Sequence, residues 1–299
     1  MYNFEEIIKK YNYDEEFSKL LYQIYSEIVS YYGNEEIVYN AFLNAEIRSV
    51  PSIYDYLSEN DMLENDNTLI TESELKKSTG LYTSKEIIEK RNHDFKISEI
   101  KRVVLIKDFD INDTEKKATL IHELCHMVKS YENEYVVKGN ILVKNSGIIE
   151  QYYRLESENG KVRKKLIKEH GIGLEEGLTA LAEVFITRKL FDEKYNQSTY
   201  GSVYALAENL TQIINGSLIK YAEMHHDRDI LYEKVDNYEY LEKLADLAFK
   251  LNLEIYRSFD QEKIEEIKNI IFRLIEDYKE LTNQNSIRKG KSKWNYMKN

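Results

Sequence analysis

Apolar residues in the first 49 positions recur close to the 3.6-residue period of an α-helix, from Phe4 through Leu20 to Ile28. Such a repeat places the apolar side chains on one face, so this segment is predicted to be helical. Residues 50–92 are polar and only weakly periodic, which indicates short helices joined by loops.

A run of β-branched apolar residues at 102–108, with the sequence RVVLIKD, predicts a strand. The residues that follow interrupt this run and include three side chains that commonly cap a helix, Asn112, Asp113 and Thr114. A helix is therefore expected to start there and to continue to about Lys129.

The rest of the chain predicts strands first and helices afterwards. The expected strands are 135–137, 141–143, 148–155 and 162–167, and Asn159-Gly160 suits the turn of a hairpin. Helical periodicity returns at 174–191, 203–214, 218–232 and 240–281. The sequence thus predicts an α+β fold that is mostly helical, with a small mixed or antiparallel sheet and a helical C-terminal half.

The chain has 299 residues, which is enough to bury a core without disulfide or metal support. We expect four regions along it: an N-terminal helical region, a core that carries the candidate chemistry, C-terminal helices and a basic flexible tail. Their predicted bounds are 1–95, 96–232, 233–284 and 285–299. The last segment holds five Lys or Arg residues and no acid, as is typical of a solvated chain end.

The charge and composition of the chain argue against several classes of function. A formal net charge of -11 argues against a nucleic-acid-binding surface. No apolar run approaches the roughly 18 residues of a membrane span, and the N-terminus lacks the basic-then-apolar pattern of a signal peptide. A cytoplasmic location is therefore expected, with export by a route without a cleaved signal left open. The single cysteine, Cys125, excludes an internal disulfide and a Cys-rich zinc finger.

The candidate chemistry centres on residues 122–126, which read H-E-L-C-H. His122 and His126 are four residues apart, so on a helix their rings lie one turn apart on the same face and can bind one metal ion. Glu123 lies beside them, where its carboxylate can act on water that the metal polarises. Apolar residues surround these three, and burying them is costly unless they are paired or bind a metal.

A catalytic zinc site needs a third protein ligand. The helix expected at 174–191 offers Glu176 as the preferred ligand and Glu175 as its competitor. The small residues Gly177, Ala180 and Ala182 would let this helix pack closely against the first. The alternative is that both are ordinary acids of a first helical turn. Glu183 is placed to accept a hydrogen bond from a zinc-bound histidine, or else is a surface acid.

Together the two motifs resemble those of the gluzincin metallopeptidases, in which H-E-x-x-H is followed by a glutamate on a later helix. Residues 175–179, EEGLT, are similar to the Asn-Glu-Gly-Phe-Ala of the aminopeptidase branch. The resemblance covers about residues 102–191. It implies a zincin-like domain that binds one Zn²⁺ per chain through His122, His126 and Glu176, with Glu123 as general base. It also implies that the strand at 103–107 is the edge strand along which the substrate lies.

The chain departs from the family pattern in several places. Glu175 stands where the aminopeptidases have Asn, Ala180 replaces an expected aspartate, and the segment between the motifs is longer and carries the predicted hairpin. The exopeptidase motif Gly-Ala-Met-Glu-Asn is missing, which favours an endopeptidase. Gluzincins usually stabilise the tetrahedral oxyanion with a Tyr or His. Tyr200 is the first candidate and Tyr204 the second. In a chain with 25 tyrosines, a packing or surface role is the favoured interpretation of either one.

The main hypothesis is therefore a zinc metallopeptidase that hydrolyses a peptide or protein substrate with a metal-activated water and Glu123 as general base. One alternative is a zincin-like metal-binding or scaffold protein without turnover. Another is a cytoplasmic regulatory protease that cleaves a repressor-type partner. The sequence indicates neither a nucleic-acid nor a membrane partner, and it leaves the oligomeric state and the cleavage preference open.

Overall fold

The helical pattern of the first 49 residues folds as three helices followed by a short strand. The computed structural model describes residues 2–63, 71–91, 94–132, 134–158, 161–196, 201–258 and 260–296. The first elements are α1 (Phe4–Tyr11), α2 (Glu15–Tyr32), α3 (Glu35–Asn44) and β1 (Glu46–Val50). Each of the three helices begins where the side chain of an Asn or Asp accepts a backbone N–H, namely at Asn3, Asp14 and Asn34. The strand β1 is an addition that the helical pattern did not predict.

The first sheet has three strands in the order β1-β3-β2. β3 (Asp94–Lys107) lies in the middle, with β1 parallel to it and β2 (Gly80–Arg91) antiparallel. The strand predicted at 102–108 is thus confirmed, but the expectation that it forms the edge is wrong, because β2 occupies the edge nearest to the candidate site. The short helices expected in 50–92 are α4 (Ile53–Glu59) and α5 (Glu72–Lys77).

All four strands predicted between 131 and 170 are present and form a second, antiparallel sheet. They are β4 (Glu134–Lys138), β5 (Ile141–Ser146), β6 (Ile149–Glu158) and β7 (Lys161–His170), in the order β4-β5-β6-β7. β6 and β7 form the predicted hairpin, in which Glu158 lies opposite Lys161. The predicted turn residues Asn159 and Gly160 lie outside the described part of the chain.

The remaining elements are helices, which confirms the α+β class with a helical C-terminal half. They are α6 (Thr114–Lys129), α7 (Ile172–Leu190), α8 (Gly201–Ile213), α9 (Gly216–His225), α10 (Arg228–Lys234), α11 (Tyr238–Arg257) and α12 (Gln261–Tyr296). The helices predicted at 218–232 and 240–281 are each divided in two. The first division falls at His226, whose φ of 55° ends α9 in the left-handed region. α12 continues to Tyr296, so the backbone of most of the predicted tail is helical.

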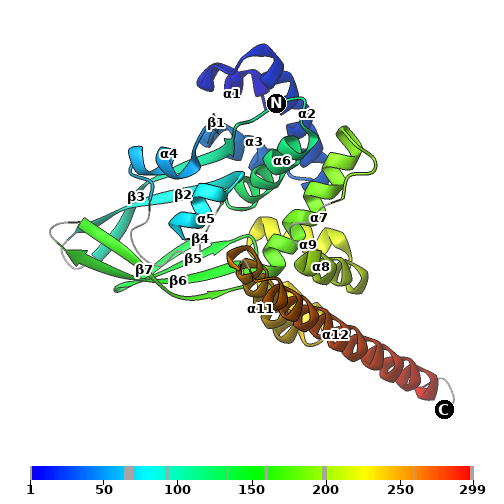
Figure 1. Ribbon diagram of the computed structural model, residues 1–299. Coiled ribbons are helices and arrows are strands. Elements are labelled where there is room, and N and C mark those ends of the chain that lie inside the picture. The colour runs from blue at the N-terminus through cyan, green and yellow to red at the C-terminus, as the bar shows by residue number, and fades with distance from the viewer. Residues whose placement is uncertain are drawn as a thin grey trace.

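The two faces of the first sheet are covered by different helices. Val103 and Leu105 of β3 pack against α4, whereas Val104 and Ile106 pack against α6 and the N-terminal helices. Because β1 and β2 both lie within the first 95 residues, the sheet spans the domain boundary predicted at residue 95. α7 packs against α6, α8 and α11, α9 also contacts α6, and α12 extends away from the rest of the chain (Figure 1). Within the described ranges, we find no helix with the length and apolar character needed to cross a bilayer.

A buried ion cluster joins the second sheet to β2. The Glu86 side chain of β2 is fully buried and lies 2.9 Å from Lys144 Nζ of β5 and 2.5 Å from Lys164 Nζ of β7. Tyr135 of β4 donates a further hydrogen bond to Glu86 Oε1, at 2.8 Å. Burial alone would raise the pKa of Glu86, but the two ammonium groups hold it well below its usual range. Glu86 therefore stays ionised and fixes the second sheet against β2.

Replacing Glu86 with Gln is expected to lower the free energy of unfolding by about 3–5 kcal/mol, because two buried lysines lose their counter-charge. Chemical denaturation at pH 7 measures this change. Because the folded pKa of Glu86 is depressed, the wild-type advantage should be full above the unfolded pKa of Glu and should decline as the pH falls below it. Glu89→Gln on the exposed end of β2 is the matched control and should change stability little. Equal stability of the Glu86→Gln protein and the wild type would show that the cluster does not hold the second sheet.

Candidate metal centre

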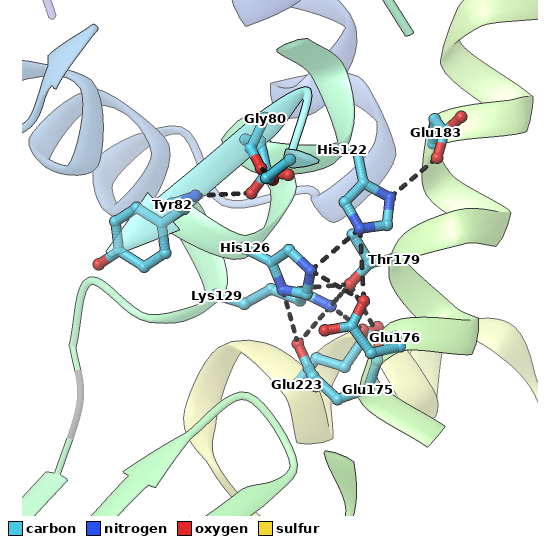
Figure 2. Close-up of polar contacts among 12 residues, drawn as sticks. Gly80, Tyr82, His122, His126, Lys129, Glu175, Glu176, Thr179, Glu183 and Glu223 are labelled. Atoms are coloured by element: carbon cyan, nitrogen blue, oxygen red, sulfur yellow. Dashed lines mark hydrogen bonds and ion pairs between the residues drawn. The ribbon is translucent and has the colours of Figure 1, made fainter. Parts of the chain in front are cut away.

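The predicted ligands lie at the contact between α6 and α7. The residues around the motif on α6 are apolar and buried, among them Leu120, Ile121 and Leu124, so the helix is embedded on most sides. His122 and His126 leave α6 toward α7, which carries Glu176 and Glu183 on the facing side (Figure 2). The motif helix is thus buried for packing reasons, and its polar side chains find their partners on one neighbouring helix.

Three ligand atoms converge at this contact. The Nε2 atoms of His122 and His126 are 3.2 Å apart, and Glu176 Oε2 lies 3.4 Å from the first and 3.5 Å from the second. Ligands about 2.0–2.1 Å from a tetrahedral zinc are separated from one another by about 3.3–3.4 Å. Glu176 Oε2 is also buried without a hydrogen-bond partner among the described residues. The spacing, the donor types and this unsatisfied oxygen all fit a zinc ion bound by the three residues.

The orientation of α7 distinguishes Glu175 from Glu176 as the candidate third ligand. Glu176 lies near Nε2 of both histidines, whereas Glu175 lies 4.0 Å from Nδ1 of His126 and forms an ion pair with Lys129. Glu175 Oε2 also accepts a hydrogen bond from the backbone of Ile148, at 3.1 Å. Glu176 is therefore the carboxylate available to a metal, as the sequence predicted, and Glu175 is already paired.

Glu183 orients His122, as the sequence suggested. Its Oε2 lies 2.8 Å from Nδ1 of His122, so a proton on Nδ1 leaves Nε2 free to face the other ligand atoms. Tyr195, in the segment after α7, donates a hydrogen bond to the second oxygen of Glu183. Burial alone would lower the pKa of His122, but Glu176 and Glu183 together raise it to about 10. This strong negative field suits a cation at the same position, and a metal would have to displace the proton.

Glu123 faces the edge strand. Its Oε2 accepts a hydrogen bond from the backbone N–H of Tyr82 on β2, at 2.6 Å. In an edge strand, alternate N–H groups point away from the neighbouring strand, which makes the Tyr82 amide available to a side chain of α6. Burial raises the pKa of Glu123, although the nearby histidines counteract the shift. A carboxylate with a raised pKa next to a metal site is well suited to accept a proton.

Gly177 does not have the role that the sequence suggested. A Cβ at this position would lie 2.3 Å from the carbonyl oxygen of Val203, so the small residue allows α8 to approach α7 and leaves the α6 side unaffected. The close contact between α6 and α7 instead uses Ala182 and Ile186, which belong to the same apolar cluster as Leu120 and Leu124 of α6. The prediction of close packing is therefore confirmed for Ala182, whereas Gly177 serves the contact with α8.

The turn between β5 and β6 inserts behind the candidate ligands. Gly147 has a φ of 57°, and its N–H donates to the carbonyl of Lys129, at 3.3 Å. A Cβ at Gly147 would lie only 2.4 Å from the carboxylate of Glu175. Only glycine meets both demands, the left-handed backbone and the missing side chain. The second sheet is thus attached directly behind the helix that carries the motif.

The two tyrosines predicted to stabilise the oxyanion lie in or just before α8. Tyr200 lies outside the described residues. Tyr204 lies in α8 and packs against Ala118, Val184 and Tyr195, which is the packing role given above as the alternative. His225 contacts the ring of Tyr221, and Nδ1 of His226 lies 3.2 Å from the carbonyl of Gly147.

Several residues of the site could not be identified from the sequence. Tyr195 and Lys129 belong to no motif with a characteristic spacing. Tyr82 contributes only its backbone N–H, and no sequence pattern reveals the role of a backbone group. Thr179 looked like an ordinary helical position. Only the positions of Lys129 and Thr179, each about one turn from a candidate ligand, could have suggested that they lie near the site.

Comparison of the chain with protein-family models, with curated proteins and with solved structures gives no match. The assignment of a function to this site therefore depends on its geometry and on the two sequence motifs.

Replacing Glu175 and Glu176 one at a time with Gln tests which of the two is the third ligand. Glu176→Gln should lower zinc affinity by more than about 100-fold, because a neutral amide is a poor zinc ligand. Glu175→Gln should instead lower the free energy of unfolding by about 3–5 kcal/mol, because Lys129 is left with one counter-charge. Zinc titration and chemical denaturation of both variants measure the two effects. The assignment of the third ligand would be wrong if Glu175→Gln lost zinc while Glu176→Gln kept it.

Proposed function

We propose that the protein is a zinc-dependent metallopeptidase, and that it acts as an endopeptidase. The observation that carries the proposal is the convergence of two Nε2 atoms and one carboxylate oxygen at 3.2–3.5 Å, with a second carboxylate, Glu123, on the same helix as the histidines. Three protein ligands leave a tetrahedral ion one position for water or substrate, which is typical of catalytic and not of structural zinc.

His122, His126 and Glu176 would hold the ion. When bound, zinc would supply Lewis-acid polarisation of a peptide carbonyl and would lower the pKa of water. Glu123 would accept a proton from the attacking water and deliver it to the leaving amine, with its raised pKa matching that task. Glu183 would keep Nδ1 of His122 protonated, so that Nε2 remains a ligand.

The position of β2 at the edge of the first sheet supports the proposal that the substrate is a peptide. It ends the first sheet among the described residues, so the outer row of its N–H and C=O groups pairs with no further strand. Apart from the Tyr82 N–H, which donates to Glu123, this row would pair with an extended chain. Its Tyr82 amide reaches Glu123, which places the strand next to the proposed base. A peptide that paired with β2 would therefore run past the groups that carry out hydrolysis.

The alternatives differ in what they require of Glu123. A scaffold protein that only binds a metal needs the three ligands and has no use for a carboxylate beside them. A regulatory protease of a repressor-type partner would use the same chemistry and would differ only in its substrate. Hydrolysis, and not metal binding alone, therefore decides between enzyme and scaffold.

Protein purified without chelator is expected to contain about one zinc ion per chain, by elemental analysis. The His122→Ala variant should contain much less, because it lacks one ligand. A wild-type protein without metal that also takes up none on titration would rule out both the peptidase and the metal scaffold.

The Glu123→Gln variant is expected to keep its zinc and its fold but to lose peptide hydrolysis by a factor of about 10²–10⁴. The amide preserves the shape of the side chain but cannot accept the proton. A library of peptides blocked at both termini provides the assay and also tests endopeptidase action. Hydrolysis of a confirmed substrate by Glu123→Gln at the wild-type rate would disprove the role of Glu123, and an inactive wild type that binds zinc would favour the scaffold.

A further inference from the structure

A second group of charged residues lies buried directly behind His126. We call it the Lys129 cluster: Lys129 of α6, Glu175 and Thr179 of α7, and Glu223 of α9. The side chains of Lys129, Glu175 and Glu223 have exposed fractions of 0%, 2% and 3%. Lys129 Nζ forms an ion pair with Glu175, lies 3.1 Å from Glu223 Oε1 and donates to Thr179 Oγ1 at 2.6 Å.

Stability alone does not account for this cluster. Withdrawing an ammonium group and two carboxylates from water is costly, and apolar side chains of similar volume often stabilise a core as well or better. The cluster also contributes none of the three ligand atoms. It lies next to Nδ1 of His126, whereas Nε2 of the same ring lies near His122 and Glu176. Its position relative to the ring of His126 is the feature that points to a role.

Thr179 connects the cluster to His126. Its hydroxyl donates to the backbone carbonyl of Glu175 at 2.8 Å and accepts from Lys129 at 2.6 Å. A hydroxyl has one proton to donate and two lone pairs to accept with, so one lone pair remains. His126 Nδ1 lies 3.5 Å from this oxygen and 4.0 Å from Glu175 Oε1. Since the proton of Thr179 is already used, Nδ1 of His126 has to be the donor.

We propose that the Lys129 cluster positions His126, with Thr179 as the residue that contacts the ring. Thr179 holds the proton of His126 on Nδ1, so that Nε2 is deprotonated and faces His122 and Glu176. Lys129 fixes the direction of the Thr179 hydroxyl and neutralises Glu175. His126 thereby receives from Thr179 what His122 receives from Glu183, and the consequence for metal affinity rests on the proposed function.

The cluster also explains a departure from the gluzincin pattern. Glu175 stands where the resembling aminopeptidase motif has a neutral Asn. A carboxylate that is buried at this position needs a cation, and Lys129 supplies one from the helix of the motif itself. The backbone N–H of Ile148 satisfies the other carboxylate oxygen, so the turn of the second sheet completes the arrangement.

The experiment replaces Thr179 with a residue that has the same shape but no hydroxyl group. Thr179→Val is the main variant and Thr179→Ser, which retains the hydroxyl, is the rescue. Thr187→Val is the matched control, because Thr187 is a fully buried threonine of the same helix whose Oγ1 has no hydrogen-bond partner among the described residues. Nitrogen-15 NMR of the imidazole rings in the metal-free protein reports which ring nitrogens of each histidine carry a proton. His122, which is oriented by Glu183, serves as the internal reference.

We expect wild-type His126 to carry its proton on Nδ1, Thr179→Val to shift it toward a mixture of tautomers, and Thr179→Ser to restore it. His122 should be unchanged in all three proteins. In zinc titrations, Thr179→Val should lower the affinity by about 10–100-fold and Thr187→Val should not. If Thr179→Val does not fold, Thr179→Ala against Thr179→Ser makes the same comparison.

An unchanged His126 tautomer in Thr179→Val would overturn the proposal. So would equal effects on His122 and His126, or the same effect from Thr187→Val, because both would indicate a general loss of packing. The NMR measurement needs no metal, so it decides the role of Thr179 even if the wild type fails to bind zinc. Normal zinc affinity in Thr179→Val would overturn the inference and leave the proposed function intact.

Discussion

The structure depends on the contact between α6 and α7, because this contact buries several charged or polar side chains that must satisfy one another. Apolar residues such as Leu120 of α6 and Ile186 of α7 bring the helices together. The polar groups that are enclosed as a result are then paired: His122 with Glu183, and Lys129 with Glu175. Glu176 Oε2 stays unsatisfied by hydrogen bonds, which is the reason for placing a cation beside it.

The second sheet is attached at two places, once to this contact and once to β2, and both attachments use buried charge. At one end the turn at Gly147 and Ile148 inserts behind Glu175. Further along the strands, Lys144 and Lys164 hold Glu86 of β2. The sheet therefore bridges the two elements that border the candidate site, the ligand helix α7 and the edge strand β2. Its insertion between the two motifs lengthens the chain without separating the ligand atoms.

The same physical principle applies to both histidines of the candidate site. Each imidazole has two nitrogen atoms, and the partner of one determines what the other can do. Glu183 occupies Nδ1 of His122, and Thr179 lies next to Nδ1 of His126. Both Nε2 atoms are consequently directed to the same point, although their partners differ in charge.

The sequence by itself determined the elements whose signals are local. The capping residues at 112–114 predicted the start of α6, and the period of the apolar residues predicted α7. The spacing of His122 and His126 placed both rings on one helical face. Glu176 was preferred over Glu175 from the motif, and the orientation of α7 agrees. The four strands of the second sheet were also predicted, because their β-branched runs and turns are continuous in the chain.

Only the tertiary structure decided the features that depend on partners far apart in sequence. β2 was missed because its face with Ser84 and Glu86 is polar, and these residues become buried only against Lys144 of the second sheet. The edge of the first sheet was assigned to the wrong strand for the same reason, since strand order is set by pairing between distant segments. Lys129 and Thr179 carry only one signal in the sequence, a spacing of about one helical turn from a candidate ligand. Their role comes from the distance to His126, which is fixed only when α6 and α7 pack together.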